Sequence, residues 1–91
     1  MNTHQELMTI TMEECGELVQ RCSKMMRKYE HIEEVEEIQR LKLMEELGDV
    51  YAMLMLQIKH GYVTLDELEA RSKVKIEKLS VWSKLIHDLP V

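Results

Sequence analysis

Residues 45–56 have the sequence Glu-Glu-Leu-Gly-Asp-Val-Tyr-Ala-Met-Leu-Met-Leu, which joins an acidic segment to an uninterrupted apolar run. The run from Val50 to Leu56 has no polar side when it is wound into a helix, so that helix must be buried on all sides. Three helices of one 91-residue chain are too few to enclose it. The sequence therefore predicts a homo-oligomer, a dimer or a tetramer, with this run at its centre.

The composition of the chain favours helices. Glu, Lys, Leu and Met are abundant, while there are three Gly, one Pro and no Phe. A sheet would call for more β-branched and aromatic residues. The length suits one domain. We predict a single all-α domain over residues 1–91, built as an antiparallel bundle of about three long helices and completed by homo-oligomerisation.

Capping patterns and apolar periodicity place the first two helices. The first is predicted over residues 3–28, with the Thr3 hydroxyl as cap and Glu6 three residues later, as in a capping box. The next segment is strongly charged and loses the apolar periodicity. A second helix is then predicted over residues 33–60, because Gly61 suits the left-handed conformation that follows a helix.

The third helix is predicted from a second capping pattern, Thr64 followed by Glu67, and should continue to about residue 87. Ser72 and Lys75 interrupt its apolar stripe midway. A lysine in such a position is often a side chain that lies along apolar surface with its ammonium group in water. The alternative is an ammonium group that is directed at an anion.

A near copy of the acidic segment at residues 45–50 lies 32 residues earlier, as Glu13-Glu14-Cys15-Gly16-Glu17-Leu18. Each copy places two carboxylates three residues apart, on one helical face. The pairs are Glu14 with Glu17 and Glu46 with Asp49. Because like charges one turn apart repel, two such pairs brought together require a positive charge between them. Carboxylate oxygens select hard divalent cations such as magnesium, manganese or calcium.

The acidic pattern has two alternative interpretations. Glu-rich helices show glutamates at spacing three by chance on a solvated face, although the repetition in two Gly-bearing segments argues against chance. A di-iron carboxylate bundle calls for Glu-x-x-His, and no His of this chain has Glu three residues before it. Gly16 and Gly48 each cost about 1 kcal/mol relative to Ala in a helix interior. We expect them to permit a close approach of helices.

The two cysteines lie seven residues apart in the first predicted helix. Seven residues span about 10 Å along a helix, which is too far for a disulfide. Cys15 and Cys22 are therefore expected to be reduced thiols in the core.

Charge and hydropathy exclude several classes of function. The net charge is −5, with 12 basic and 17 acidic residues, whereas binding to polymeric nucleic acid requires a clustered positive field. The N-terminal residues carry no basic segment followed by an apolar run, and no stretch approaches a membrane span of roughly 20 apolar residues. We expect a cytoplasmic protein that binds neither polymeric nucleic acid nor membranes.

The acidic pattern resembles the signature of a known superfamily. Glu13-Glu14-x-x-Glu17 followed after 28 residues by Glu46-x-x-Asp49 is similar to the motif of the MazG-like all-α nucleoside triphosphate pyrophosphohydrolases, which include dimeric dUTPases and dCTP pyrophosphatases. The similarity spans essentially the whole chain. Phosphoribosyl-ATP pyrophosphohydrolases are similar in size and fold, but residues 9–12 lack the Lys expected before the first acidic pair.

The resemblance implies cleavage of a nucleoside triphosphate between its α- and β-phosphates, which yields a monophosphate and pyrophosphate. It implies Mg²⁺, with Mn²⁺ as a substitute, held by Glu14, Glu17, Glu46 and Asp49. The cation would bind phosphate oxygens and lower the pKa of an attacking water. Glu13 points about 100° away from Glu14 around the helix, and it is a candidate ligand or water-orienting group.

Further residues are candidates for contacts with the nucleotide. The substrate phosphates would meet Lys24, which lies seven residues after Glu17 on the same face, and Lys75 and Lys78 of the third helix. An apolar pocket for the base would be formed by His4, Gln5, Met8, Met12 and Met53. Core packing is the alternative role of these methionines.

The sequence is also compatible with two other functions. The chain could be a helical interaction module whose Met-rich faces bind a partner helix, with the acids serving only solubility. It could also be a nucleotide sensor that keeps the fold and the metal site without hydrolysis. Magnesium and nucleotide together should stabilise the enzyme or the sensor but not the interaction module. Turnover of nucleotide then distinguishes the enzyme from the sensor.

Overall fold

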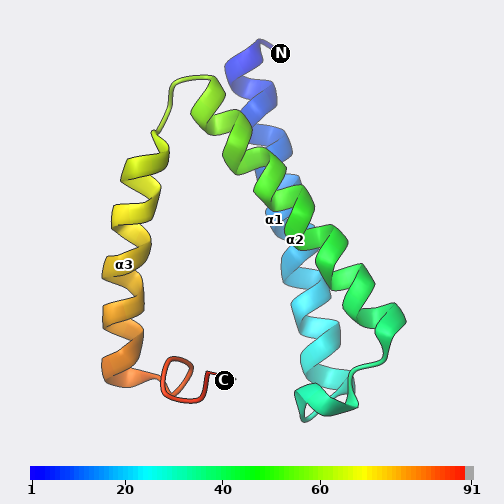
Figure 1. Cartoon of the computed structure of the whole chain (residues 1–91). Helices are drawn as coiled ribbons and strands as arrows, with labels where there is room; N and C mark the ends of the chain where they lie inside the picture. Colours follow the sequence, from blue (N-terminus) through cyan, green and yellow to red (C-terminus); the bar gives the residue numbers. More distant parts are fainter. Residues whose placement is uncertain (90–91) are drawn as a thin grey trace. The chain divides into compact units, whose positions relative to one another are not determined.

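The chain folds into helices, as predicted (Figure 1). The computed structural model describes residues 1–89. Within them there is no strand, and none of the helices has the length and apolar composition of a membrane span. The elements are α1 (Thr3–Lys28), the short 3₁₀ helix η1 (Ile32–Glu34), α2 (Glu37–Lys59) and α3 (Leu65–Trp82). Residues up to His60 form one compact unit, and a second unit that begins at Gly61 contains α3.

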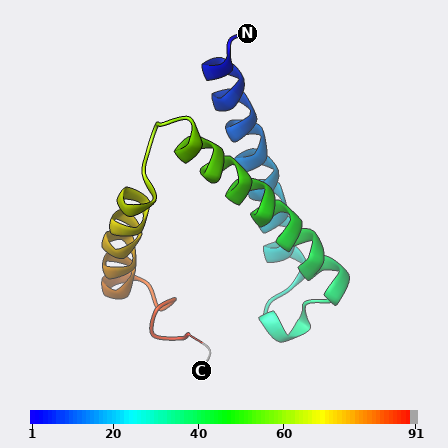
Figure 2. The ribbon, with the colours of Figure 1, turned by 45° about the horizontal axis from the view of Figure 1, so that its top comes forward.

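α1 and α2 pack against each other as an antiparallel pair, and Figures 1 and 2 show them side by side from two directions. Near one end, the Gln57 amide donates to the Thr11 hydroxyl over 3.1 Å. Towards the other end, Arg21 donates to the Gln39 side chain over 3.4 Å. Leu7 and Met53 are the buried hydrophobic residues of the described chain, with 6% and 7% of their surfaces exposed.

The contact between the two helices follows a regular spacing of four and three residues, as in coiled coils. Residues of this seam are all buried or half-buried. They are Leu7, Thr11, Glu14, Leu18, Arg21 and Met25 on α1, and Gln39, Leu43, Glu46, Val50, Met53 and Gln57 on α2. Polar residues hold half of these positions, so the seam is an unusually hydrophilic helix contact.

A second apolar stripe on each helix follows the seam by one position. It consists of Met12, Cys15, Val19, Cys22 and Met26 on α1, and Met44, Leu47, Tyr51, Leu54 and Ile58 on α2. Because the helices run in opposite directions, the same one-residue offset places both stripes on one side of the pair. Most of this apolar face is exposed, including Val19 at 68% and Tyr51 at 64%. One copy of the chain therefore does not bury the run from Val50 to Leu56.

The predicted boundaries of α1 and α2 need two corrections. The capping box of α1 is formed by Asn2 and Gln5, each side chain accepting from the backbone N–H of the other, and not by Thr3 and Glu6. α2 begins at Glu37 and not at residue 33, because η1 and the extended residues after it complete the reversal between the antiparallel helices. The end of α2 is confirmed, with Gly61 at φ +83°.

The start of α3 is confirmed, but its end is not. Thr64 and Glu67 form the predicted capping box. The helix stops at Trp82, five residues before the predicted end, because Ser83 is extended and its hydroxyl accepts from the Leu85 N–H. The His87 ring also hydrogen-bonds the Ser80 carbonyl over 2.8 Å, which satisfies a group that the last turn leaves without a helical partner.

The predictions for the glycines and the cysteines were wrong within one copy. A Cβ atom at Gly16 or Gly48 would meet nothing within 4 Å, so neither glycine marks a close approach of α1 to α2. Cys15 and Cys22 are free thiols, but both are exposed on the apolar face and not in a core.

The corrected cap of α1 can be tested directly. Replacing Asn2 by Ala should lower the free energy of unfolding by about 1 kcal/mol, because the Gln5 N–H loses its acceptor. Thr3→Ala is the matched control and should have a smaller effect, since Thr3 lies inside the helix. Urea unfolding followed by circular dichroism measures both. A larger loss in Thr3→Ala than in Asn2→Ala would contradict this assignment.

Candidate metal centre

The four predicted acids lie together midway along the α1–α2 pair. One carboxylate oxygen from each of the four residues lies within 4.8 Å of the others. Glu14 and Glu46 belong to the seam and are half-buried, whereas Glu17 and Asp49 are exposed. The near repetition in the sequence thus becomes a near symmetry in space, with each helix supplying one seam acid and one exposed acid.

The exposed acids show which side of the helix pair the cluster faces. Glu17 and Asp49 each follow their seam acid by three residues, which turns them about 60° around the helix in the sense opposite to the apolar face. Both therefore border the opposite side of the pair, which we call the open side. The cluster is buried at its base by the seam and accessible from the open side.

The electrostatics of the cluster are unfavourable without a bound cation. One oxygen of Glu14 and one of Glu46, Oε2 in each, is buried and has no hydrogen-bond partner. Burial raises the pKa of Glu14 above its ordinary value, and the negative charges of Glu17, Asp49 and Glu46 raise it further. Carboxylate oxygens that converge without a positive charge or a donor are costly to bury. The arrangement is suited to a cation.

The ligand set fits a hard divalent cation. All four candidate ligands are carboxylates, and neither His nor Cys belongs to the cluster found in the described residues. Such an all-oxygen set suits Mg²⁺, Mn²⁺ or Ca²⁺ better than Zn²⁺. Two of the acids face solvent, which leaves room for waters or phosphate oxygens that Mg²⁺ typically retains as ligands. The residues present therefore fit the predicted metal.

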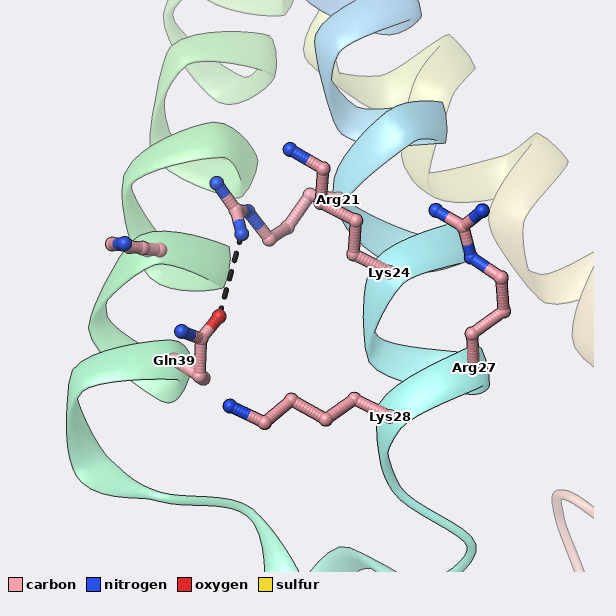
Figure 3. Close-up of a pocket in the computed structure, with 6 residues that line it drawn as sticks. Arg21, Lys24, Arg27, Lys28 and Gln39 are labelled. Atoms are coloured by element: carbon pink, nitrogen blue, oxygen red, sulfur yellow. Dashed lines mark hydrogen bonds between the residues drawn. The ribbon is translucent and has the colours of Figure 1, made fainter.

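The other predicted site residues are dispersed. Glu13 is exposed and lies outside the cluster of four. Lys24 lines a pocket between α1 and α2 together with other cationic side chains (Figure 3). Lys75 and Lys78 are exposed residues of α3, where the Lys75 ammonium lies 5.4 Å from the centre of the Trp82 ring. Their role as phosphate ligands stays a prediction.

The predicted base-pocket residues do not form one pocket. Met53 lines a pocket at the N-terminal end of α1, but the other four do not. Gln5 belongs to the capping box, Met12 is 66% exposed on the apolar face, Met8 is half-buried and His4 is exposed. The pocket is instead lined by Thr3, Glu6, Leu7, Ile10, Met53, Leu56 and His60.

Several residues near the acids were not predicted from the sequence to contact the nucleotide. Lys42 lines the cationic pocket, and Ile10 and Leu56 line the apolar one. A seven-residue spacing from the acids would have found Ile10, Lys42 and Leu56, because positions seven apart fall on nearly the same side of a helix. Only Lys24 had been identified by this spacing.

The raised pKa of Glu14 predicts a pH dependence of stability. The folded protein holds this proton more tightly than the unfolded chain, so the stabilisation is full below the ordinary pKa of 4.5 and is lost as pH rises through the raised value. In metal-free buffer, Glu14→Gln should therefore flatten the fall of Tm between pH 4 and 8 and raise Tm at pH 7. Glu13→Gln is the control. Parallel pH profiles of wild type and Glu14→Gln would refute this.

Comparison with known proteins agrees with this geometry. The sequence profile of the MazG nucleotide pyrophosphohydrolase domain matches residues 2–80, which include all four clustered acids and most of α3. Comparisons with curated proteins and with solved structures found no match. The match covers most of the chain. The chain therefore belongs to the MazG nucleotide pyrophosphohydrolase family.

Proposed function

We propose that this chain is a Mg²⁺-dependent nucleoside triphosphate pyrophosphohydrolase that releases a nucleoside monophosphate and pyrophosphate. Its family indicates a nucleotide pyrophosphohydrolase in general. The observation that supports Mg²⁺-dependent hydrolysis of nucleoside triphosphates is the convergence of four carboxylates within 4.8 Å. Two of them have a buried oxygen that has no hydrogen-bond partner. A partner-binding module has no need of such a cluster, which lowers stability unless a cation is bound.

The residues of the cluster have distinct tasks in this proposal. Glu14 and Glu46 would hold the cation from the seam, and Glu17 and Asp49 would hold it from the open side. When bound, Mg²⁺ offsets the charge that develops on phosphate oxygens and lowers the pKa of a water ligand. Glu13 precedes Glu14 by one residue, which turns it to the open side. We assign it the orientation of the attacking water.

The proposed reaction needs no covalent nucleophile. The water oxygen forms a bond to the α-phosphorus while the bond from that phosphorus to the α–β bridging oxygen breaks. The bridging oxygen leaves with pyrophosphate, and the proton of the water passes by way of Glu13 to solvent. The acids thus serve positioning and charge neutralisation, which supply most of the catalysis in phosphoryl transfer.

Substitution within the cluster tests this function. Glu46→Gln and Asp49→Asn should each lower metal-dependent pyrophosphate release by at least about 100-fold, since a catalytic cation is worth several kcal/mol in the transition state. The helical signal should be unchanged. Glu33→Gln, an exposed acid of η1, is the matched control.

The assay uses a panel of ribo- and deoxyribonucleoside triphosphates, with magnesium, with manganese and with chelator. Undiminished activity in both cluster variants would eliminate this metal site. Absence of turnover combined with stabilisation by magnesium and nucleotide would identify a sensor, and indifference to both would identify an interaction module.

We further propose that a second copy of the chain covers the apolar face. This face combines two stripes with coiled-coil spacing on neighbouring helices, and a hollow in it is lined by Met44, Leu47, Gly48 and Tyr51. Packing the faces of two α1–α2 pairs together would form a four-helix arrangement that buries the apolar face, including Tyr51 and Leu54 of the run from Val50 to Leu56. It would leave the open side, with the acids, accessible to substrate.

The oligomer can be tested by placing charges on this face. Leu47→Glu and Val19→Glu should each convert the homo-oligomer to a monomer, because a carboxylate would be buried in the apolar contact. Ile32→Glu is the control, since Ile32 is 80% exposed in η1 and lies outside the apolar face. Sedimentation velocity gives the mass of the wild-type protein and of each variant. A monomeric wild-type protein at micromolar concentration would overturn the proposal.

A further inference from the structure

The open side of the α1–α2 pair carries the same order of residues on both helices. Along α1, Ile10, Glu17 and Lys24 follow one another at seven-residue intervals. Along α2, the corresponding series is Leu56, Asp49 and Lys42, in the opposite chain direction. Because the helices are antiparallel, like residues meet across the seam. The pair therefore has an apolar, an acidic and a basic layer, spaced by about 10 Å.

The basic layer is a formed pocket (Figure 3). It has a volume of about 450 Å³ and is lined by Arg21, Lys24, Arg27, Lys28, Gln39 and Lys42. Arg21 and Lys28 extend from α1 towards α2, whereas Arg27 is turned away at the rim. Five positive charges thus surround one pocket between two helices.

These cations lack sufficient negative partners within residues 1–89. The Lys28 ammonium lies 3.4 Å from a Glu36 oxygen, but none of the other four pocket cations forms an ion pair with a described carboxylate. Nε of Arg21 is buried and has no hydrogen-bond partner. Like charges held together in this way favour a multiply charged anion, and guanidinium and ammonium groups are the usual partners of phosphate.

The pocket begins one helical turn from the acids. Arg21 follows Glu17 by four residues and Lys42 precedes Glu46 by four, which is about 6 Å along each helix. A phosphate chain that meets a cation at the acidic cluster would therefore place its next phosphates among the pocket cations. The terminal phosphate would lie between Arg21, Lys24 and Lys42.

The apolar layer is a second pocket on the other side of the acids. It has a volume of about 250 Å³, and its apolar lining includes Ile10 and Leu56. Glu6 and His60 add hydrogen-bonding groups at its edge. An apolar pocket with a few polar groups is the usual form of a site for a flat organic ring. Ile10 precedes Glu14 by one turn, which places this pocket next to the acids.

We infer that the nucleoside triphosphate lies along the α1–α2 seam in one direction. Its base occupies the Ile10–Leu56 pocket, its α-phosphate lies at the acids, and its β- and γ-phosphates occupy the basic pocket. This inference rests on the proposed function for its substrate class. It makes Arg21, Lys24 and Lys42 specificity determinants, because a diphosphate would leave part of the basic pocket unfilled.

The direction in which the nucleotide lies along the seam can be determined without an activity assay, from amide chemical shifts of the wild-type protein. Pyrophosphate with magnesium should shift the amides of residues 20–28 and 38–43, and a nucleoside monophosphate should shift those of residues 6–10 and 53–60. The opposite assignment of the two ligands would overturn the inference. So would pyrophosphate shifts confined to α3.

Substitutions provide an independent test. Lys24→Gln and Lys42→Gln should raise KM for triphosphates roughly tenfold or more, with a smaller change in kcat, and should reduce the preference for triphosphates over diphosphates. Lys59→Gln, with the same change of charge at the far end of α2, is the control. Unchanged KM and unchanged preference would overturn the inference, even in an active enzyme. Absence of turnover with intact pyrophosphate shifts would overturn the proposed function and retain the basic pocket.

Discussion

The α1–α2 pair is organised around the repulsion among four carboxylates, two in its seam and two beside it. Glu14 and Glu46 occupy positions where a simple helix pair would place apolar residues, and a buried oxygen on each lacks a partner. Burial and neighbouring negative charge both favour the neutral form of Glu14, as its raised pKa shows. In our proposal, a divalent cation would reverse this balance, because it would turn four repelling groups into ligands. Stability and cation binding would then be coupled.

The polar seam also explains why so much apolar surface lies elsewhere. A helix pair that gives half of its contact positions to polar residues gains little from burial, and Leu7 and Met53 are the buried hydrophobic residues of the described chain. The compensating apolar surface is the face formed by the stripes through Val19 and Tyr51. In our account, a second copy supplies the missing burial on this face. The opposite side then stays open, and the acids can meet substrate there.

Much of this arrangement could be predicted from particular residues. The acids at spacing three in two similar segments, Glu14 with Glu17 and Glu46 with Asp49, indicated the four members of the cluster, and Thr64 with Glu67 located the start of α3. Local patterns suffice where the interaction itself is local. The failures came where two patterns compete: Asn2 with Gln5 replaced Thr3 with Glu6, one residue away, and Ser83 ended α3 before its apolar periodicity did.

The pairing of the helices was the part that single-helix patterns could not supply. Cys15 and Cys22 belong to a regular apolar stripe, but a stripe does not reveal which of two adjacent helix faces meets the neighbour. The structure assigns the contact to the stripe of Leu18 and Glu14 and leaves the cysteines exposed. Only this register brings Arg21 opposite Gln39, and hence reveals the basic pocket beside the acids.

The most direct test of the central claim is to locate the bound cation by paramagnetic broadening. Mn²⁺ added in substoichiometric amounts to the ¹⁵N-labelled protein should broaden the amides of residues 13–18 and 45–50 first, and excess Mg²⁺ should restore them. Broadening that is centred on another acidic segment, such as residues 30–37, would contradict the account. Equal broadening throughout the chain would do the same, because it would show that the four carboxylates form no specific cation site.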